Sequence, residues 1–208
     1  MTEQENKELM YASDEDIVFY LKCVEGLPTL AGLDGSGNGS DGIPLPYGLG
    51  AHSVRCLREI IKIVKPKAML EIGFNMGWSA SLWLSLSNKL KLVSCDISAK
   101  EETIMAAKFL QLKYNKRFFY YMRNNEWLPN LKNKFKYDLI FIDGGHLIKD
   151  VVADIELALE LQIPHIGFDD FLEEFGEVQK AIQTFGNKLE QVNVNGNIAL
   201  YKNKYTHE

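Results

Sequence analysis

Two segments of this chain place acidic side chains directly after a run of apolar residues. YDLIFIDGGH puts Asp143 after one run, with His146 three residues later, and HIGFDDF puts Asp169 and Asp170 after another. In open parallel sheets, ligands bind beyond the carboxyl ends of the strands. Carboxylates held side by side repel one another unless a cation compensates them. Oxygen ligands favour Mg²⁺, Ca²⁺ or Mn²⁺ over zinc, so we expect a hard divalent metal at Asp143, Asp169 and Asp170.

A further segment with chemical potential is MLEIGFNMGWS, residues 69–79. It predicts a short buried strand, a turn framed by Gly73 and Gly77, and a following helix. Such a strand–turn–helix unit binds nucleosides or phosphate-bearing ligands. A dinucleotide site would show G-x-G-x-x-G, and a phosphate-binding loop would continue with Gly-Lys-Ser/Thr, so both are disfavoured. The spacing present is E-x-G-x-x-x-G, beginning at Glu71 and with Asn75 inside the turn.

The elements that must position these residues alternate between strand and helix. Predicted strands are 68–73, 90–96, 117–123, 137–143 and 164–169, and predicted helices are 51–65, 77–87, 100–113, a short piece near 126–133, 148–161 and 176–187. This alternation indicates a parallel sheet with right-handed crossovers. Residues 191–202 then form two extended runs around Asn195-Gly196, which predicts a hairpin. The fold class is therefore α/β, a Rossmann-like doubly wound sheet, mostly parallel, with a C-terminal antiparallel hairpin.

The first 50 residues differ in character from the rest. Ser13 and Asp16 form a capping box that predicts a helix of about ten residues ending near Gly26. Residues 32–50 hold seven of the sixteen glycines, so no regular element is expected there. This segment is either a flexible linker or a flap that closes over a substrate. We therefore expect an N-terminal helix and Gly-rich flap over 1–50 and a main domain over 51–208, together one compact unit.

The totals exclude several classes of protein. The chain of 208 residues has a net charge of −5, whereas a nucleic-acid-binding protein usually shows a basic face. No apolar run reaches the ~20 residues of a membrane span, and the polar N-terminus is unlike a signal peptide. The three cysteines are an odd number without paired spacing. Free thiols suit a reducing compartment, so we expect a cytoplasmic protein.

The turn at Glu71–Gly77 and the acid that closes KLVSCD, Asp96, together resemble the class I S-adenosylmethionine-dependent methyltransferases. The terminal hairpin also matches that fold, and the resemblance covers roughly residues 50–202. It implies that Glu71, Gly73, Asn75 and Gly77 hold the amino-acid end of S-adenosylmethionine and that Asp96 accepts hydrogen bonds from both ribose hydroxyls. It also implies an adenine contact at Asn124, although the adjoining Arg123 departs from the small or acidic residues usual there.

The sequence D-G-G-H, a helix carrying Asp154, and a D-D pair ending the next strand are similar to metal-dependent small-molecule O-methyltransferases. These relatives act on catechols and on sugars of natural products. The resemblance implies Mg²⁺ at Asp143, Asp169 and Asp170, where it would chelate two neighbouring substrate oxygens. It assigns catalytic roles to Asp143, through the metal, and to His146 as general base.

Simpler interpretations stay open at each of these positions. Asp143 and the pair Asp169-Asp170 could cap helices, Asp96 could do the same, and His146 could be a polar loop residue. The protein could also be a metal-independent methyltransferase, an NAD-dependent enzyme or a non-catalytic cofactor-binding protein. The sequence predicts a small-molecule acceptor without naming it. A homodimer through the N-terminal helices is compatible with it.

Overall fold

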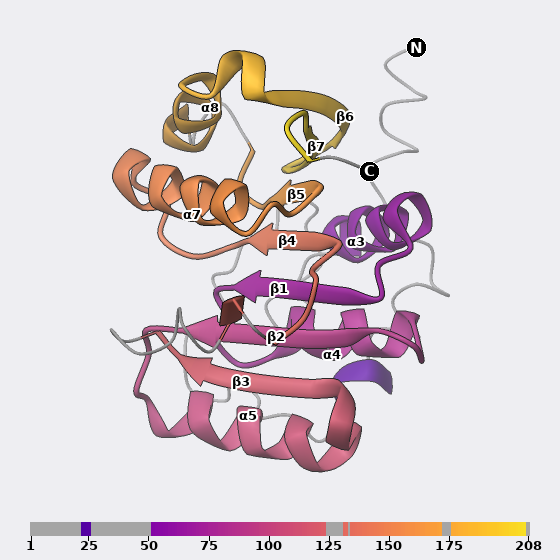
Figure 1. The fold of residues 1–208 in the computed structure, drawn as a ribbon. Helices are drawn as coiled ribbons and strands as arrows, with labels where there is room; N and C mark the ends of the chain where they lie inside the picture. Colours follow the sequence, from indigo (N-terminus) through magenta and orange to yellow (C-terminus); the bar gives the residue numbers. More distant parts are fainter. Residues whose placement is uncertain (1–21, 26–50, 124–130, 133, 172–175, 207–208) are drawn as a thin grey trace.

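The computed structural model describes residues 22–25, 51–123, 131–132, 134–171 and 176–206, and these form one seven-stranded sheet. The strand order is β3-β2-β1-β4-β5-β7-β6. The strands are β1 (Ala68–Ile72), β2 (Lys91–Asp96), β3 (Phe118–Met122), β4 (Leu139–Ile142), β5 (His165–Phe168), β6 (Leu189–Asn195) and β7 (Ile198–Asn203). β1 to β5 pair in parallel, and β7 runs antiparallel to both β5 and β6. The predicted fold class and the terminal hairpin are confirmed (Figure 1).

Helices cover both faces of the sheet. They are α3 (Ala51–Val64), α4 (Trp78–Leu86), α5 (Glu101–Tyr114), α7 (Ile148–Glu160) and α8 (Gly176–Gln183), with 3₁₀ turns at Asn115–Arg117 and Gly186–Lys188. Buried side chains of α3, α4 and α5 share one apolar cluster with one face of the strands, and those of α7 and α8 share a second cluster with the other face. The result is a three-layer sandwich, as expected for a parallel sheet.

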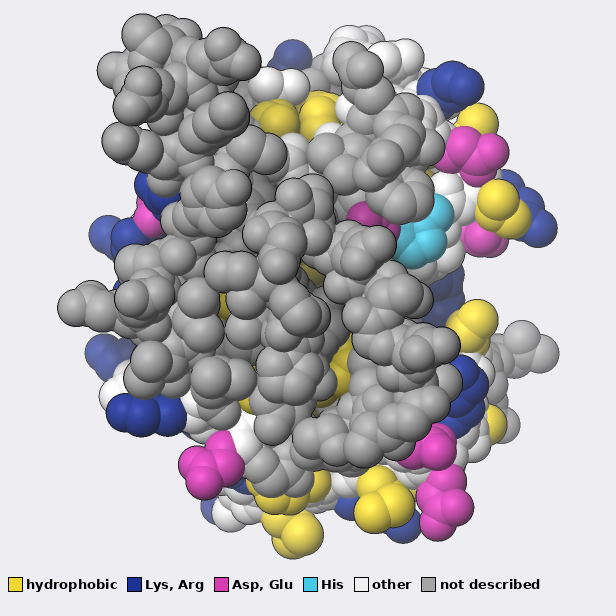
Figure 2. Space-filling model, turned by 180° about the vertical axis from the view of Figure 1, so that it is seen from behind, with side chains coloured by type: hydrophobic (Ala, Val, Ile, Leu, Met, Phe, Trp, Pro, Cys, Tyr) yellow, Lys and Arg dark blue, Asp and Glu magenta, His cyan; other side chains and the backbone are white. Residues whose placement is uncertain are grey.

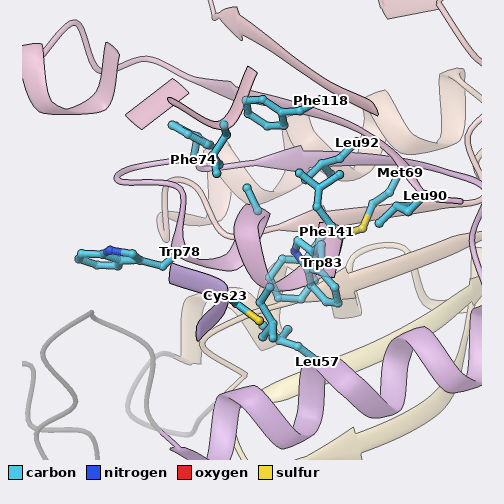
Figure 3. Packing of buried hydrophobic residues seen from close by; sticks show 14 of the residues in the cluster. Cys23, Leu57, Met69, Phe74, Trp78, Trp83, Leu90, Leu92, Phe118 and Phe141 are labelled. Carbon is cyan, nitrogen blue, oxygen red and sulfur yellow. The ribbon is translucent and has the colours of Figure 1, made fainter. Parts of the chain in front are cut away.

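The two clusters follow from the alternation of side chains along the strands. On β1, Met69 points toward the face covered by α4, and Leu70 and Ile72 point toward the face covered by α7. The α4 face is built on aromatic contacts (Figure 3): the Trp83 ring meets Phe141 with centroids 5.2 Å apart. Because buried apolar area is what stabilises these layers, the strand ends are held in fixed positions relative to one another.

The N-terminal segment contacts this domain through the end of a helix. Of the predicted N-terminal helix, only residues 22–25 are described, and the main-chain carbonyl of Cys23 accepts hydrogen bonds from Ser81 Oγ and Lys113 Nζ. A lysine at helical C-terminal carbonyls is favourable for the helix dipole. The Gly-rich segment 32–50 and most of the predicted helix at 126–133 lie outside the described residues. No helix in the described ranges is long and apolar enough to cross a membrane.

Candidate active site at the carboxyl edge of the sheet

Main-chain hydrogen bonds continue the sheet one residue past the ends of its parallel strands. Arg123 N donates to Asp96 O at 2.7 Å and Gly73 N to Cys95 O at 2.9 Å. Asp143 N donates to Ile72 O at 2.8 Å, and Asp169 N to Ile142 O at 3.0 Å. These four bonds, which we call the edge ladder, fix the residues that follow β3, β1, β4 and β5 side by side. The structure therefore brings the predicted cofactor turn and the predicted acidic residues to one edge.

The two glycines of the turn are required by the protein's own packing. Gly73 has a φ of +94°, and a β-carbon there would lie 1.8 Å from the carbonyl oxygen of Asp143. Gly77 has a φ of +78°, and a β-carbon there would collide with the Phe74 ring at 2.7 Å. Both conformations disfavour side chains on steric grounds. Glycine is therefore needed at these two positions because Gly73 packs against the residue after β4 and Gly77 packs against Phe74.

Asp96 holds the turn closed from the end of β2. Its Oδ2 accepts hydrogen bonds from the main-chain N–H groups of Phe74 at 2.8 Å and Asn75 at 2.6 Å, and its Oδ1 accepts from Ser98 N at 2.7 Å. Asn75 adopts the left-handed conformation, with a φ of 47°. Helix α5 begins only at Glu101, so Asp96 does not cap it. A carboxylate has about four acceptor sites, so these three bonds leave capacity for a ligand hydroxyl.

Glu71 lies beneath the turn, inside the protein. Its side chain is fully buried, and it accepts hydrogen bonds from Trp83 Nε1 at 3.0 Å and Ser94 Oγ at 2.6 Å. Burial raises the pKa of this carboxyl to about 7, against the lowering effect of hydrogen bonds from Ser94, Ser79 and Trp83. Both oxygens therefore accept from protein donors on the α4 side. This placement suits support of the turn better than the contact with a positively charged ligand group expected from the sequence.

His146 and Asp170 form an ion-pair geometry at the same edge. The His146 Nδ1 and Asp170 Oδ2 atoms are 2.8 Å apart. Asp170 has a φ of 54°, an uncommon conformation for a residue other than glycine. Seen from behind the view of Figure 1, a histidine side chain lies beside an acidic one, next to residues that are not described (Figure 2).

Asp169 and Asp143 complete the acidic group. Asp169 Oδ1 accepts from the Asn197 side chain and from Asp170 N, each at 2.9 Å. Burial and the neighbouring charge of Asp170 raise the pKa of Asp169 to about 7. Burial raises the pKa of Asp143 well above its ordinary value, and the charges of Asp169 and Asp170 raise it further. Helix α7 has no side-chain cap, so Asp143 does not cap it.

The predicted metal ligands are neighbours, but their present arrangement is not that of a metal site. Among the described residues, no group of three His, Cys, Asp or Glu side chains is arranged to hold a metal ion. Asp170 contacts His146 instead, and Asp169 accepts two protein donors. The chemistry of the donors nevertheless fits a hard cation, because all three are carboxylates and their mutual repulsion is what a cation removes.

Sequence reasoning missed the partner of Arg123. Its guanidinium nitrogen lies 2.6 Å from Asp154 Oδ1 on α7, and the Asp154 side chain is fully buried. The signal was an arginine at the end of a strand and an acid on an otherwise apolar helix face, which become partners only through the fold. Asn124, the predicted adenine contact, lies outside the described residues. His165 begins β5, at the opposite edge of the sheet, and its Nδ1 lies 3.3 Å from Asp138 O.

Comparison with known proteins finds a methyltransferase domain in the chain. Residues 70–171 match the family described as "Methyltransferase domain". No curated protein sequence matches the chain. Among solved structures it is similar to the O-methyltransferase TomG from Streptomyces achromogenes, involved in tomaymycin synthesis and in complex with SAM, with 15% identity, TM-score 0.62 and coverage of 98% of this chain and 99% of that one.

Two further structures share the fold. An O-methyltransferase from Bacillus cereus in complex with SAH has 17% identity and TM-score 0.60, with 96% of each chain covered. A SAH-bound methyltransferase from Podospora anserina has 16% identity and TM-score 0.57, covering 93% of this chain and 89% of that one. The matched domain contains both the turn after β1 and the acidic residues after β4 and β5. The chain therefore contains a segment, residues 70–171, that matches a methyltransferase domain, within a mixed seven-stranded sheet whose fold it shares with these methyltransferase structures.

Proposed function

We propose that this protein transfers a methyl group from S-adenosylmethionine to a hydroxyl oxygen of a small molecule, such as a sugar or a catechol-like compound. The observation that carries the proposal is the edge ladder, which sets the Asp96-closed turn beside Asp143 and Asp169. A donor site and a proton-accepting group next to one another are what such a transfer needs. The similar structures from Streptomyces achromogenes and Bacillus cereus are O-methyltransferases with SAM and SAH bound.

The turn and Asp96 are the proposed donor site. Asp96 would accept from ribose hydroxyls while keeping the main-chain N–H groups of Phe74 and Asn75 in place. The acidic edge would favour the positively charged sulfonium over its neutral product by simple Coulomb attraction. Glu71 would support the donor site from inside the protein, through its hydrogen bonds with Trp83 and Ser94. Asn75 and Gly77 would contribute through the shape of the turn.

His146 is the proposed general base. If Nδ1–H donates to Asp170 Oδ2, the lone pair of the neutral ring lies on Nε2. Nε2 takes the proton of the acceptor hydroxyl as the oxygen attacks the methyl carbon. The carbon–sulfur bond breaks with its electron pair going to sulfur, giving the methyl ether and S-adenosylhomocysteine. Alignment of oxygen, carbon and sulfur supplies much of the acceleration.

Magnesium at Asp143, Asp169 and Asp170 is the finer part of the proposal. Its support is the chemistry of three crowded carboxylates, two of which have a raised pKa. A divalent cation bound there would hold neighbouring oxygens of the acceptor and lower the hydroxyl pKa. The present contacts use Oδ2 of Asp170 and Oδ1 of Asp169, and a carboxylate has about four acceptor sites, so a cation could be bound without breaking these contacts.

A metal-independent methyltransferase is the second candidate. The pairing of Asp170 with His146 favours it, because this contact alone is enough to orient the ring nitrogen of His146. In this version the dyad alone activates the hydroxyl. A chelator distinguishes the two candidates, since only the metal-assisted reaction would be lost in EDTA.

Calorimetry and a methyl-transfer assay test the proposal. We expect S-adenosylhomocysteine to bind the wild-type protein and NADH not to bind. With labelled S-adenosylmethionine and a panel of sugars and catechols, His146→Gln should lose about a hundredfold or more of the rate while S-adenosylhomocysteine affinity stays the same. His165→Gln is the matched control, because that ring lies at the opposite edge of the sheet. Absence of S-adenosylhomocysteine binding would overturn the proposed function, and binding without transfer to any acceptor would favour a non-catalytic role.

The cellular compartment, the partners and the oligomeric state of the protein remain predictions. We propose a cytoplasmic enzyme with a small-molecule acceptor and without nucleic-acid or membrane partners, on the basis of its charge and free thiols. Size-exclusion chromatography with light scattering would test the homodimer.

A further inference from the structure

An ion pair on the α7 face of the sheet joins the residue after β3 to helix α7, next to the candidate active site. Arg123 follows β3, which is the outermost strand on one side of the sheet. Its guanidinium lies 2.6 Å from Asp154 Oδ1 on α7, which packs against β4. The strands β2 and β1 lie between β3 and β4 in the sheet order. The pair therefore spans the width of the region where the cofactor turn and the acidic loop meet.

The residues around the ion pair show that it lies next to the place where the turn after β1 and the Asp143 loop meet. Its charges act on Cys95, the residue before Asp96 in β2, which lies on the α7 face of the sheet. A β-carbon on Gly144, the residue after Asp143, would lie 3.7 Å from Asp154 Oδ2 and 3.1 Å from Ile72 Cγ2. The main-chain N–H of Arg123 is itself part of the edge ladder, bonded to Asp96 O at 2.7 Å. The Arg123 end of the pair is thus joined to Asp96 through the main chain, and the Asp154 end lies next to the residue that follows Asp143.

Burying this ion pair has a desolvation cost that apolar residues of similar volume would avoid. We therefore expect a role that apolar residues could not fill. Asp154 is fully buried, and burial raises its pKa while Arg123 lowers it. Buried ion pairs can often be replaced by apolar residues of similar volume without loss of stability, whereas removal of one partner leaves an uncompensated charge. What an arginine adds is a planar group with fixed donor directions. Such a group sets a distance and an angle between two segments.

We propose that Arg123 and Asp154 are positioning residues that fix the spacing between Asp96 and the Asp143 loop, and so the width of the cleft that receives the adenosine part of the cofactor. Neither residue needs to touch the cofactor for this role. The inference rests on the proposed function, because it assumes that S-adenosylmethionine binds between Asp96 and Asp143. It also explains why an arginine can stand where relatives carry a small or acidic residue: its guanidinium contacts Asp154.

The test is calorimetric titration of the full chain with S-adenosylhomocysteine. Asp154→Asn and Arg123→Lys should weaken binding by about tenfold, the order of effect of residues that act on a site without touching its ligand. Glu160→Gln is the matched control. Glu160 is on the same helix and pairs with Lys132, yet both side chains are about half exposed, so its loss should leave affinity unchanged.

Stability is separated from positioning by a double variant, Arg123→Met with Asp154→Leu. An apolar pair should restore the thermal midpoint to near the wild-type value, because no charge is left buried. We expect S-adenosylhomocysteine affinity to stay low in this variant. Recovery of both stability and affinity, or wild-type affinity in folded Asp154→Asn, would overturn the positioning role. Failure of the wild-type protein to bind S-adenosylhomocysteine would instead overturn the proposed function.

Discussion

A β-carbon on Gly73 would lie 1.8 Å from the carbonyl oxygen of Asp143, so the cofactor turn and the acidic loop are in direct main-chain contact. The N–H of the same aspartate donates to Ile72 O at 2.8 Å, which fixes the contact from the other side. The proposed donor and acceptor sites are therefore parts of one packed unit. A change that shifts the main chain at either residue should alter both of them.

Replacing Gly73 with alanine should destabilise the protein strongly. The new methyl group would overlap the Asp143 carbonyl, and the φ of +94° is unfavourable for alanine. We expect a loss of about 2 kcal/mol or more in the free energy of unfolding, measured by urea denaturation, together with weaker S-adenosylhomocysteine binding. Gly176→Ala is the control, since no atom of the described residues lies within 4 Å of a β-carbon there. Equal stability of the two variants would contradict the packing described here.

Replacing Glu71 with glutamine should change how stability depends on pH. The pKa of Glu71 is about 7 in the folded protein, against a reference value of 4.5. Between these pH values the folded state holds more protons than the unfolded state, so the free energy of unfolding falls as pH rises. Because glutamine does not titrate, Glu71→Gln should remove a part of that fall on the order of a few kcal/mol. The fold should be kept, because the amide can still accept from Trp83 and donate to Ser94.

Urea denaturation at a series of pH values measures this effect. Glu59→Gln serves as the control, because its carboxylate lies at the surface beside Lys62. Asp143 and Asp169 contribute slopes of the same sign, so the informative quantity is the difference between Glu71→Gln and wild type at each pH. A constant difference between pH 4.5 and 7 would show that Glu71 does not titrate as the structure implies.

Replacing Asp143 with asparagine should abolish methyl transfer while S-adenosylhomocysteine affinity stays near the wild-type value. The substitution keeps the main-chain contacts of the edge ladder and removes one carboxylate from the crowded group. Single-turnover transfer of a labelled methyl group measures the effect. Unchanged turnover would exclude a role for Asp143 in catalysis or metal binding.

Parallel assays in EDTA and with added Mg²⁺ then assign the reason for the Asp143 effect. Loss of wild-type activity in EDTA and recovery with Mg²⁺ would support the metal-assisted reaction. Full activity in EDTA would support the His146–Asp170 dyad acting without a metal.

Periodicity in the sequence predicted the order and type of the elements that the structure describes from residue 51 onward. Alternating strands and helices leave few topologies, and the glycine after Asn195 indicates the hairpin. The strand bounds differ from prediction by one or two residues, because main-chain pairing and not apolar character ends a strand. For example, Gly73 and Asp143 were expected within strands, and each follows the last paired residue of one.

The side-chain partners at the site could not be predicted in the same way. The sequence shows that Glu71 and Asp96 are acids next to a turn, but not toward which side each carboxylate points. Strand alternation directs Glu71 to the α4 face, where Trp83 and Ser94 enclose it. The contacts between His146 and Asp170, and between Arg123 and Asp154, join residues more than 20 positions apart. Such pairs depend on three-dimensional packing that no local pattern encodes.

The edge ladder has a consequence for any attempt to redesign acceptor preference. Each of its bonds joins loops that are distant in sequence, so lengthening one loop by a single residue would shift the registration of its neighbour as well. In a paired strand, such a shift also turns every later side chain to the opposite face. Inserted or deleted residues at positions 73, 96, 123, 143 or 169 should therefore disrupt several loops together. Point substitutions of side chains that project away from these bonds are the route by which such a protein can acquire a new acceptor.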